Sequence, residues 1–390
     1  MARLVAFGIT CCLTVAVAAA GVAWAAEPAP SPFPAAEGPA LQEPEATLAA
    51  ALSCPGGFGH PDHEPVLLVH GTGATGQLNW GWNYAKVLPA MGYDVCTVDL
   101  PNRALDDIQV SSEYVVYAIR TMARTSGRLV DVVGHSQGGL EPRWALKWWP
   151  DTRRLVDDDV MLASPNHGVY AADVWPPGVC TAACYQMART AQFIAALNAG
   201  DETPGAVSYT SLYSRTDELV QPTTTAPMDG AANIAIQDVC PGRPVEHASM
   251  AADAAVFALV IDALTHPGPA DPARFDPATC SQGTFPGVDP VAGFAELAKE
   301  ITEARTFPYH PVAGEPPLAP YARSAPPPAA GPSAQPAPGP AASPPTGPRV
   351  SAAGGRLPAT GGGLGPWGLA LVAAGAAAWL VGRRTVPLRG

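Results

Sequence analysis

Basic residues are scarce in this sequence and never form a long run. Lys and Arg number 22 against 34 Asp and Glu, so the formal net charge of the 390 residues is −12 and the isoelectric point lies near 5.0. Proteins that bind nucleic acid backbones present a basic patch or stripe to the phosphates. No nucleic acid partner is therefore expected. No internal repeat is visible either.

The first 26 residues have the pattern of a secretory signal peptide. Arg3 precedes an apolar run over residues 4–23, and the small residues Ala25 and Ala26 end the segment. A positive start, an apolar centre and a small-residue cleavage site are the features of such peptides. We therefore expect residues 1–26 to be removed and the protein to be secreted. A retained N-terminal membrane anchor is the alternative.

Residues 357–390 resemble the cell-wall sorting signal that Gram-positive sortases cleave. The motif Leu-Pro-Ala-Thr-Gly at residues 357–361 precedes an apolar segment over residues 367–381 and then two arginines. The resemblance implies cleavage between Thr360 and Gly361, with sortase and peptidoglycan as partners and the cell wall as the location. A membrane-anchoring helix is the alternative, because the apolar segment is close to the roughly 20 residues that cross a bilayer.

Two segments rich in Pro and Ala flank one long body. They cover residues 27–45 and 324–356. Such segments bury little apolar surface and favour extended polyproline geometry, so we expect a flexible leader and a stalk. The body, residues 46–323, is long enough for one large domain with a substantial core. We expect it to be a monomer.

Six cysteines follow the signal peptide, and none follows Cys280. An even number in a secreted chain predicts disulfides. We pair Cys54 with Cys96, Cys180 with Cys184 and Cys240 with Cys280, although six cysteines allow fifteen connectivities. A zinc site is the alternative for Cys180 and Cys184, but nothing nearby supplies further ligands. No metal and no cofactor are expected.

Short apolar runs alternate with helical patterns through the body. Strand-like runs lie at residues 66–69, 93–98, 129–133, 160–163, 207–213 and 233–239, and helical patterns at 84–91, 108–123, 140–149 and 248–264. This alternation predicts an α/β fold with a mostly parallel sheet and helices on both faces. Functional groups in such folds gather at the carboxyl ends of the strands.

The most informative motif is Gly-His-Ser-Gln-Gly at residues 134–138. It follows a β-branched run and precedes a helical pattern. This strand–turn–helix context is typical of a nucleophile elbow. Gly134 and Gly138 remove side chains where the sharp turn crowds the backbone. We therefore predict that Ser136 is a catalytic nucleophile; an ordinary serine at a glycine-rich corner is the alternative.

Ser136, Asp217 and His247 occur in the chain order of α/β-hydrolase triads. A serine hydroxyl is a weak nucleophile and needs an imidazole to accept its proton, and a carboxylate fixes the tautomer of that imidazole. Asp201 and Asp238 compete for the role of the acid. We prefer Asp217, because Asp201 falls in a loop at a helix end and Asp238 falls inside a strand pattern.

Acyl transfer also needs donors for the oxyanion of the tetrahedral intermediate. The segment His70-Gly71-Thr72-Gly73 follows the first clear strand, where one donor loop is expected. We predict that Thr72 supplies an N–H and a hydroxyl, and that Gln137, the residue after the nucleophile, supplies the second N–H. A plain glycine turn is the alternative.

Several segments resemble the family of Candida antarctica lipase B and its bacterial relatives. They span most of the body in the family's order and are residues 65–73, 136–140, 216–222, 246–248 and 320–323. The resemblance implies an α/β-hydrolase fold, with Ser136 as nucleophile, Asp217 as acid, His247 as base, and Thr72 and Gln137 as oxyanion donors. It also places disulfides at Cys54–Cys96 and Cys240–Cys280.

The sequence departs from the family pattern around the substrate entrance. The elbow begins with Gly134-His135, the segment 164–167 replaces an acidic one, and Cys180 and Cys184 are additional. Residues 170–187 correspond to the family's lid-like region, which a Cys180–Cys184 bridge would stiffen. A helix over residues 291–301 is expected at the opposite wall.

Other notable residues have mainly structural interpretations. Helical spacing favours core packing for Trp144 and Trp148 over lipid contact. The three aspartates at residues 157–159 are predicted to form a solvated turn, with a calcium site as the alternative. A metal site is also the alternative for His60 and His63, which precede the first clear strand.

The sequence therefore predicts a secreted, wall-anchored serine lipase or esterase that cleaves carboxylic esters of the acylglycerol type through an acyl-enzyme. The expected substrate partner is a lipid or another ester. An acyltransferase or polyester hydrolase with the same triad remains an alternative, as does a non-catalytic surface binding module.

Overall fold

The computed structural model describes residues 34–289, 291–293, 295, 296 and 310–323. The predicted signal peptide, stalk and sorting signal lie outside the described residues, as does much of the helix expected over residues 291–301. Within the described part of the chain, no helix has the length and hydropathy needed to span a bilayer.

One sheet of seven strands organises the domain, in the order β1-β3-β2-β4-β5-β6-β7. All neighbouring strands are parallel except β1, which is antiparallel to β3. The strands are β1 (Leu52–Ser53), β2 (Val66–Val69), β3 (Val95–Val98), β4 (Val130–His135), β5 (Val156–Leu162), β6 (Ser208–Tyr213) and β7 (Ala232–Ala235). The carboxyl ends of six parallel strands therefore meet at one edge.

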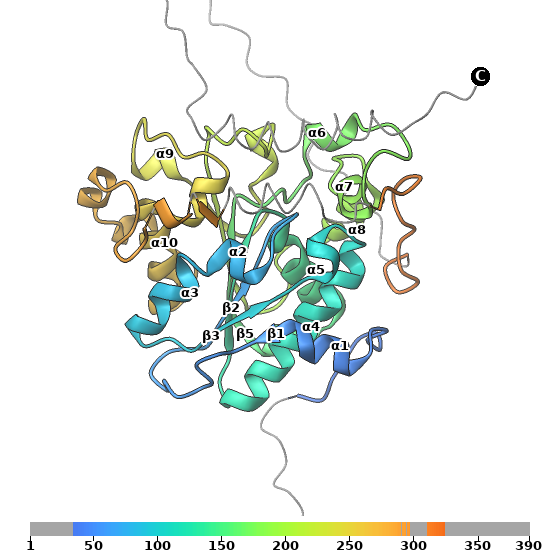
Figure 1. The fold of residues 1–390 in the computed structure, drawn as a ribbon, viewed down its shortest axis with the longest axis horizontal. Helices are drawn as coiled ribbons and strands as arrows, with labels where there is room; N and C mark the ends of the chain where they lie inside the picture. The colour runs from blue at the N-terminus through green and yellow to red at the C-terminus, as the bar shows by residue number, and fades with distance from the viewer. Residues whose placement is uncertain (1–33, 290, 294, 297–309, 324–390) are drawn as a thin grey trace, which may run out of the picture. The chain divides into compact units, whose positions relative to one another are not determined.

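Helices cover both faces of the sheet, as predicted. Figure 1 shows α1, α4 and α5 on one side and α3 and α10 on the other. The α-helices are α1 (Glu45–Ala51), α2 (Gly76–Trp80), α3 (Tyr84–Val87), α4 (Ile108–Ser126), α5 (Leu140–Trp148), α6 (Tyr170–Asp173), α7 (Ala182–Gln186), α8 (Gln192–Leu197), α9 (Ile236–Val239) and α10 (Ala254–Thr265).

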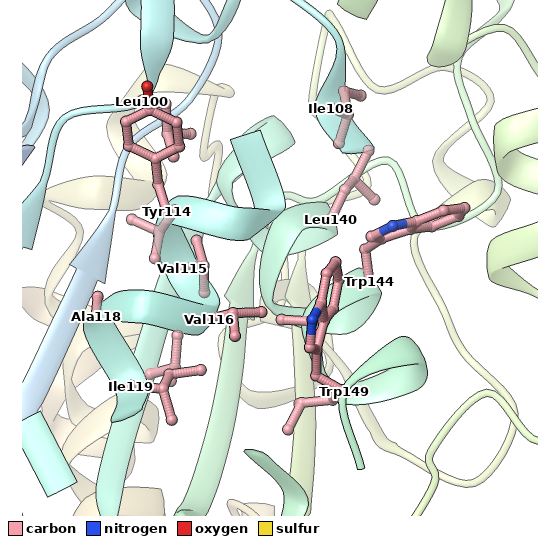
Figure 2. Packing of buried hydrophobic residues seen from close by; sticks show 14 of the residues in the cluster. Leu100, Ile108, Tyr114, Val115, Val116, Ala118, Ile119, Leu140, Trp144 and Trp149 are labelled. Atoms are coloured by element: carbon pink, nitrogen blue, oxygen red, sulfur yellow. The ribbon is translucent and has the colours of Figure 1, made fainter. Parts of the chain in front are cut away.

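The sheet separates two hydrophobic cores. In β2, Leu67 and Val69 join the core beneath α4 and α5, whereas Val66 and Leu68 join the core beneath α10. Such a strand is buried on both faces, which explains its unbroken apolar run. Figure 2 shows the first core, which contains side chains of α4 and α5. The Trp144 ring stacks on Phe193, with the ring centroids 4.6 Å apart. Trp144 is fully buried, which confirms its predicted packing role.

All three predicted disulfides are present. Cys54–Cys96 and Cys240–Cys280 join residues 42 and 40 positions apart, and Cys180–Cys184 closes a short loop with a separation of 4. The two long-range bridges contribute about 4 kcal/mol each in the chain-entropy model. Because Cys180 and Cys184 are bonded to each other, the zinc alternative is excluded.

Two segments differ from the sequence-based expectation. Residues 157–159 do not form a solvated turn: they belong to β5, and Asp158 and Asp159 are buried. Asp is disfavoured in strands, but β4 and β6 pair with β5 on both sides. Residues 233–239 are strand only to Ala235, after which α9 begins. Periodicity does not separate strand from helix in so short an apolar run.

Candidate active site

Ser136 lies at the carboxyl end of β4, where the chain turns sharply before α5. Its φ is 57°, a left-handed conformation that costs a residue with a side chain free energy and recurs at functional sites. A Cβ at Gly134 would lie 2.2 Å from the Gly138 carbonyl oxygen, and a Cβ at Gly138 would lie 2.4 Å from that of Val69. Only glycine fits these two positions, so the turn is the predicted elbow.

His247 and Asp217 form a buried hydrogen-bonded pair at the same edge of the sheet. His247 Nδ1 lies 2.9 Å from Asp217 Oδ2, and the two residues are 5% and 3% exposed. Asp217 follows β6 by a short loop, and His247 follows β7 and α9. The structure therefore brings together the acid and the histidine that the sequence selected.

The electrostatics of this pair favour its charged form. Burial raises the pKa of Asp217, but the charge and hydrogen bond of His247, together with N–H donors from Leu219 and Val220 at 2.8 Å, lower it below the ordinary value. Burial lowers the pKa of His247, but the charge and hydrogen bond of Asp217 outweigh this and leave it raised. Hydrogen bonds that satisfy a buried carboxylate keep it ionised.

His135 lies beside this pair, a contact that the sequence did not indicate. Its ring centroid is 5.1 Å from that of His247, and its Nε2 lies 3.1 Å from the His247 carbonyl oxygen. Burial and the neighbouring His247 lower the pKa of His135 to about 3. His135 is therefore neutral, so it packs against His247 without adding a second positive charge.

The Ser136 hydroxyl makes no hydrogen bond to another described residue. Ser136 follows His135 directly in the chain, and the His135 ring contacts that of His247. Serine–histidine hydrogen bonds are often long in ligand-free enzymes and shorten when substrate binds.

Thr72, Gln137 and Glu141 form a hydrogen-bonded chain next to Ser136. The Thr72 hydroxyl donates to Gln137 Oε1 at 2.5 Å, and Gln137 Nε2 donates to Glu141 Oε1 at 2.8 Å. Within the described residues, neither backbone N–H of Thr72 and Gln137 has an acceptor, although Gln137 is fully buried. Two free N–H groups beside a nucleophile are suited to bind an oxyanion.

Glu141 was not singled out from the sequence. It is fully buried at the start of α5, and its Oε2 has no hydrogen-bond partner. Burial raises its pKa to about 8 despite the hydrogen bond from Gln137. A neutral carboxyl group is therefore expected beneath Gln137 at pH 7.

His70 and Asn79 hold the loop that carries Thr72. The Leu100 N–H donates to His70 Nε2 at 2.9 Å, so the proton resides on Nδ1, which donates to the Gly71 carbonyl oxygen at 2.8 Å. Asn79 Oδ1 accepts the Gly71 N–H at 3.1 Å and lies 3.2 Å from His135 Nδ1. These contacts fix the Thr72 loop relative to the elbow.

The lid-like region, residues 170–187, contains α6 and α7 and exposes large apolar side chains. The exposed fractions are 55% for Tyr170, 59% for Val174 and 41% for Val179. Tyr170 N–H donates to the Gln221 carbonyl oxygen at 2.7 Å, which ties α6 to the loop after Asp217. Leu219 of that loop is 37% exposed, so the lid-like region and the loop after Asp217 both expose apolar side chains.

The competing residues occupy other positions. Asp201 accepts the Thr203 N–H in an exposed turn. Asp238 lies in α9, not in a strand, and forms an exposed ion pair with Arg215. His60 Nδ1 lies 2.9 Å from Asp94, and the His63 ring stacks on Tyr93. Among the described residues these two histidines are not part of a set of three possible metal ligands.

Comparison with known proteins identifies the family. The chain is 35% identical to lipase B of Pseudozyma antarctica over 234 residues, which cover 57% of this chain and 68% of that lipase. The chain belongs to the lipase B family. The family model for class 2 lipases also matches residues 63–255.

Structural comparison agrees with this assignment. The crystal structure of Aspergillus fumigatus lipase B is 32% identical, with a TM-score of 0.67 over 72% of this chain and 73% of that chain. A triacylglycerol lipase of Burkholderia plantarii is 28% identical over 163 residues, 40% of this chain and 42% of that protein. The fold is thus the α/β-hydrolase fold, and membership in this family makes the protein a carboxylic ester hydrolase.

Proposed function

We propose that the protein is a secreted, surface-anchored serine lipase or esterase in which Ser136, Asp217 and His247 form the catalytic triad. The observation that carries this proposal is the buried His247–Asp217 pair, with its 2.9 Å contact. The His247 ring contacts His135, and the next residue, Ser136, is held in a left-handed turn. Because the Asp217 carboxylate faces Nδ1, the His247 proton resides there and leaves Nε2 as the base.

In the first half of the reaction, the Ser136 hydroxyl attacks the ester carbonyl while His247 Nε2 accepts its proton. The backbone N–H groups of Thr72 and Gln137 stabilise the oxyanion. The Thr72 hydroxyl donates to Gln137 in this structure, so it must rotate before it can add a third hydrogen bond. His247 then protonates the leaving alcohol, and the acyl-enzyme remains.

In the second half, His247 removes a proton from water, which attacks the acyl-enzyme. The carboxylic acid leaves, and Ser136 recovers its proton. The charge of Asp217 stabilises the imidazolium that forms in both halves. No step requires a metal ion or an organic cofactor.

The apolar surface beside the site supports esters of long-chain acids as substrates. Tyr170, Val174 and Val179 on the lid-like region and Leu219 beside Asp217 are all exposed. Exposed apolar side chains that together form one patch mark surfaces that contact membranes or lipid. We therefore propose acylglycerols at a lipid–water interface as the substrate class.

A fluorophosphonate probe tests the nucleophile directly. The purified protein should be labelled at Ser136, and Ser136→Ala should abolish both labelling and p-nitrophenyl ester cleavage. Ser281→Ala, at an exposed serine outside the site, serves as the matched control and should keep both. An unlabelled wild-type protein would overturn the proposed mechanism.

Chain-length assays test the substrate class. Hydrolysis of butyrate, octanoate and palmitate esters should be compared below and above the concentrations at which each ester forms an interface. We expect the rate with long esters to rise when the interface forms. A Val174→Ser variant should reduce this rise and leave cleavage of soluble butyrate esters unchanged. Equal rates with and without an interface would indicate an esterase for soluble substrates.

We also propose that the terminal segments place this enzyme outside the cell, on the wall. Residues 1–26 would direct secretion, and sortase would join Thr360 to peptidoglycan. Mass spectrometry of muramidase-released wall fragments should find a C-terminal peptide that ends at Thr360 and carries a wall peptide. An intact C-terminus in the membrane fraction would instead indicate a retained anchor.

A further inference from the structure

A β-bulge brings three aspartates together at the amino-terminal edge of the sheet. Val130 of β4 pairs with Val156 of β5, but Val132 pairs with Asp159. Strand β4 thus advances by two residues while β5 advances by three, so the single residue Asp131 faces both Asp157 and Asp158. Bulges of this type place two residues opposite one.

Carboxylate oxygens of Asp131, Asp157 and Asp158 lie within 4.8 Å of one another. Asp131 is 2% exposed and Asp158 is 3% exposed, whereas Asp157 is open to solvent. Ligands that bind Ca²⁺ at about 2.3–2.6 Å lie at most about 5 Å apart across the ion. The three oxygens therefore fit around one ion without movement of the backbone.

The buried members of this cluster lack the partners that buried carboxylates normally have. Oδ1 of Asp131 and Oδ1 of Asp158 are buried without a hydrogen-bond partner. Within the described part of the chain, none of the three aspartates forms an ion pair with a basic side chain. The buried carboxylate of Asp151, by contrast, has a basic partner: Arg120 donates hydrogen bonds to both of its oxygens, at 2.7 and 2.8 Å.

Neighbouring groups add oxygen atoms rather than positive charge. Glu64 precedes β2, next to Pro65, whose carbonyl oxygen accepts the Asp131 N–H at 3.0 Å. The Tyr93 hydroxyl is buried without a partner, and the charges of Asp131 and Glu64 act on it. Like charges this close, buried without a counter-ion, are strongly unfavourable.

We propose that Asp131, Asp157 and Asp158 bind one hard divalent cation, Ca²⁺, at the edge of the sheet opposite the candidate active site. Three carboxylates offer up to six oxygen ligands, which suits Ca²⁺, and exposed Asp157 provides the entry path. The ion would neutralise the buried charges and join β4 to β5 at the bulge. Its role is structural, because the catalytic groups lie at the other ends of the strands.

Electrostatic effects within the cluster agree with a need for a counter-ion. Burial, followed by the charges of Asp157 and Asp159, raises the pKa of Asp158 to about 8. Burial and the charge of Asp158 also raise the pKa of Asp131 well above its ordinary value. Without a cation, protons are the other means by which these groups become neutral.

Titration calorimetry and thermal unfolding of the whole purified protein test the site. After EDTA treatment at pH 7.5, CaCl₂ should bind with a stoichiometry of about one and a Kd of about 10⁻⁶–10⁻⁴ M, and the Tm should rise by several degrees. Asp157→Asn, at the exposed ligand, should fold normally and weaken Ca²⁺ binding at least about tenfold. Asp229→Asn, at an exposed aspartate outside the cluster, is the matched control and should bind like the wild type.

Two results would overturn the proposal. One is the absence of both heat and a Tm shift on addition of Ca²⁺, with a Tm that depends only on pH; the cluster would then hold protons alone. The other is unchanged Ca²⁺ binding by both Asp157→Asn and Asp131→Asn, which would place the ion elsewhere.

Discussion

The two edges of the sheet bury carboxylates in opposite ways. At the carboxyl edge, Asp217 accepts hydrogen bonds from two backbone N–H groups and from His247, and its pKa is lowered. At the amino edge, Asp131 and Asp158 are buried just as deeply, yet an oxygen of each lacks a partner and their pKa values are raised. Burial alone does not decide the charge of a carboxylate; the donors around it do.

Glu141 is intermediate between these two cases. It lies at the carboxyl edge and accepts one hydrogen bond, from Gln137, while its other oxygen has none. One neutral donor does not offset burial, so its pKa is raised to about 8. The comparison therefore predicts that replacing the carboxyl group by an amide harms the protein at Asp217 and stabilises it at the sites without partners.

Asp217→Asn should have the largest effect. Loss of the charge that orients and stabilises His247 should lower kcat/KM for p-nitrophenyl butyrate by about 10³- to 10⁴-fold. The proposed mechanism requires neutral His247 as the base, and Asp217 raises the pKa of His247. Activity of the wild type should therefore rise with pH through this raised pKa, and in the variant the rise should occur at lower pH.

Asp238→Asn is the matched control for this substitution. Asp238 is an exposed aspartate of α9 whose ion pair with Arg215 faces solvent, and such pairs contribute little. We expect kcat/KM to change less than about twofold. A similar loss in both variants would mean that Asp217 is not the acid of the triad.

Glu141→Gln should change how stability depends on pH. The pKa of Glu141 rises from its ordinary 4.5 to about 8, so between these values the folded protein holds a proton that the unfolded chain has released. This proton makes wild-type stability fall with rising pH, by about 1.4 kcal/mol per pH unit. The stability of the variant does not fall in this way. The difference in the free energy of unfolding between the variant and the wild type should therefore increase from pH 5 to pH 8, in favour of the variant.

Urea unfolding at pH 5, 6, 7 and 8 measures this difference. Glu45→Gln, at an exposed glutamate of α1, is the control and should run parallel to the wild type at all four values. A constant offset between Glu141→Gln and the wild type would show that Glu141 is ionised in the folded protein throughout this range.

The positions of Ser136, Asp217 and His247 at the carboxyl ends of the strands could be predicted, because local sequence patterns determine them. The elbow at Ser136 needs glycines at fixed positions, and the strands bring Asp217 and His247 to one edge by their order alone. The burial of Trp144 was confirmed for a similar reason, since helical periodicity carries that information. The disulfide pairing was confirmed too, but spacing alone does not determine it, because six cysteines allow fifteen connectivities.

The amino edge could not be predicted in the same way. Three consecutive aspartates indicate a turn by propensity, and only pairing with β4 and β6 forces residues 157–159 into a strand. The facing Asp131 comes from a distant part of the chain through a register shift that leaves no local pattern. The contact of His135 with His247 and the position of Glu141 beneath Gln137 likewise depend on packing between elements.

Thr72→Val should weaken the stabilisation of the oxyanion. The Thr72 hydroxyl holds the Gln137 amide in the chain that ends at Glu141, and valine keeps the shape without the hydroxyl. We expect kcat to fall about 10- to 100-fold with little change in KM. Thr72→Ser keeps the hydroxyl and should retain most of the activity. Full activity of the valine variant would show that the backbone N–H groups suffice.

Asp158→Asn should have the smallest effect. The most informative result is whether the substitution raises or lowers the free energy of unfolding. In EDTA at pH 7.5 the amide spares the folded protein the uptake of a proton at Asp158, whose pKa is raised to about 8 by burial and by two neighbouring aspartates. The free energy of unfolding should therefore rise by about 1–2 kcal/mol. In excess Ca²⁺ the wild type should be the more stable of the two proteins, because it gains the full free energy of Ca²⁺ binding and the variant gains less. Urea unfolding in both buffers, with Asp229→Asn as the control, measures the two differences. If the variant is less stable than the wild type even in EDTA, then Asp158 has a favourable partner, and the contrast between the two edges fails at that residue.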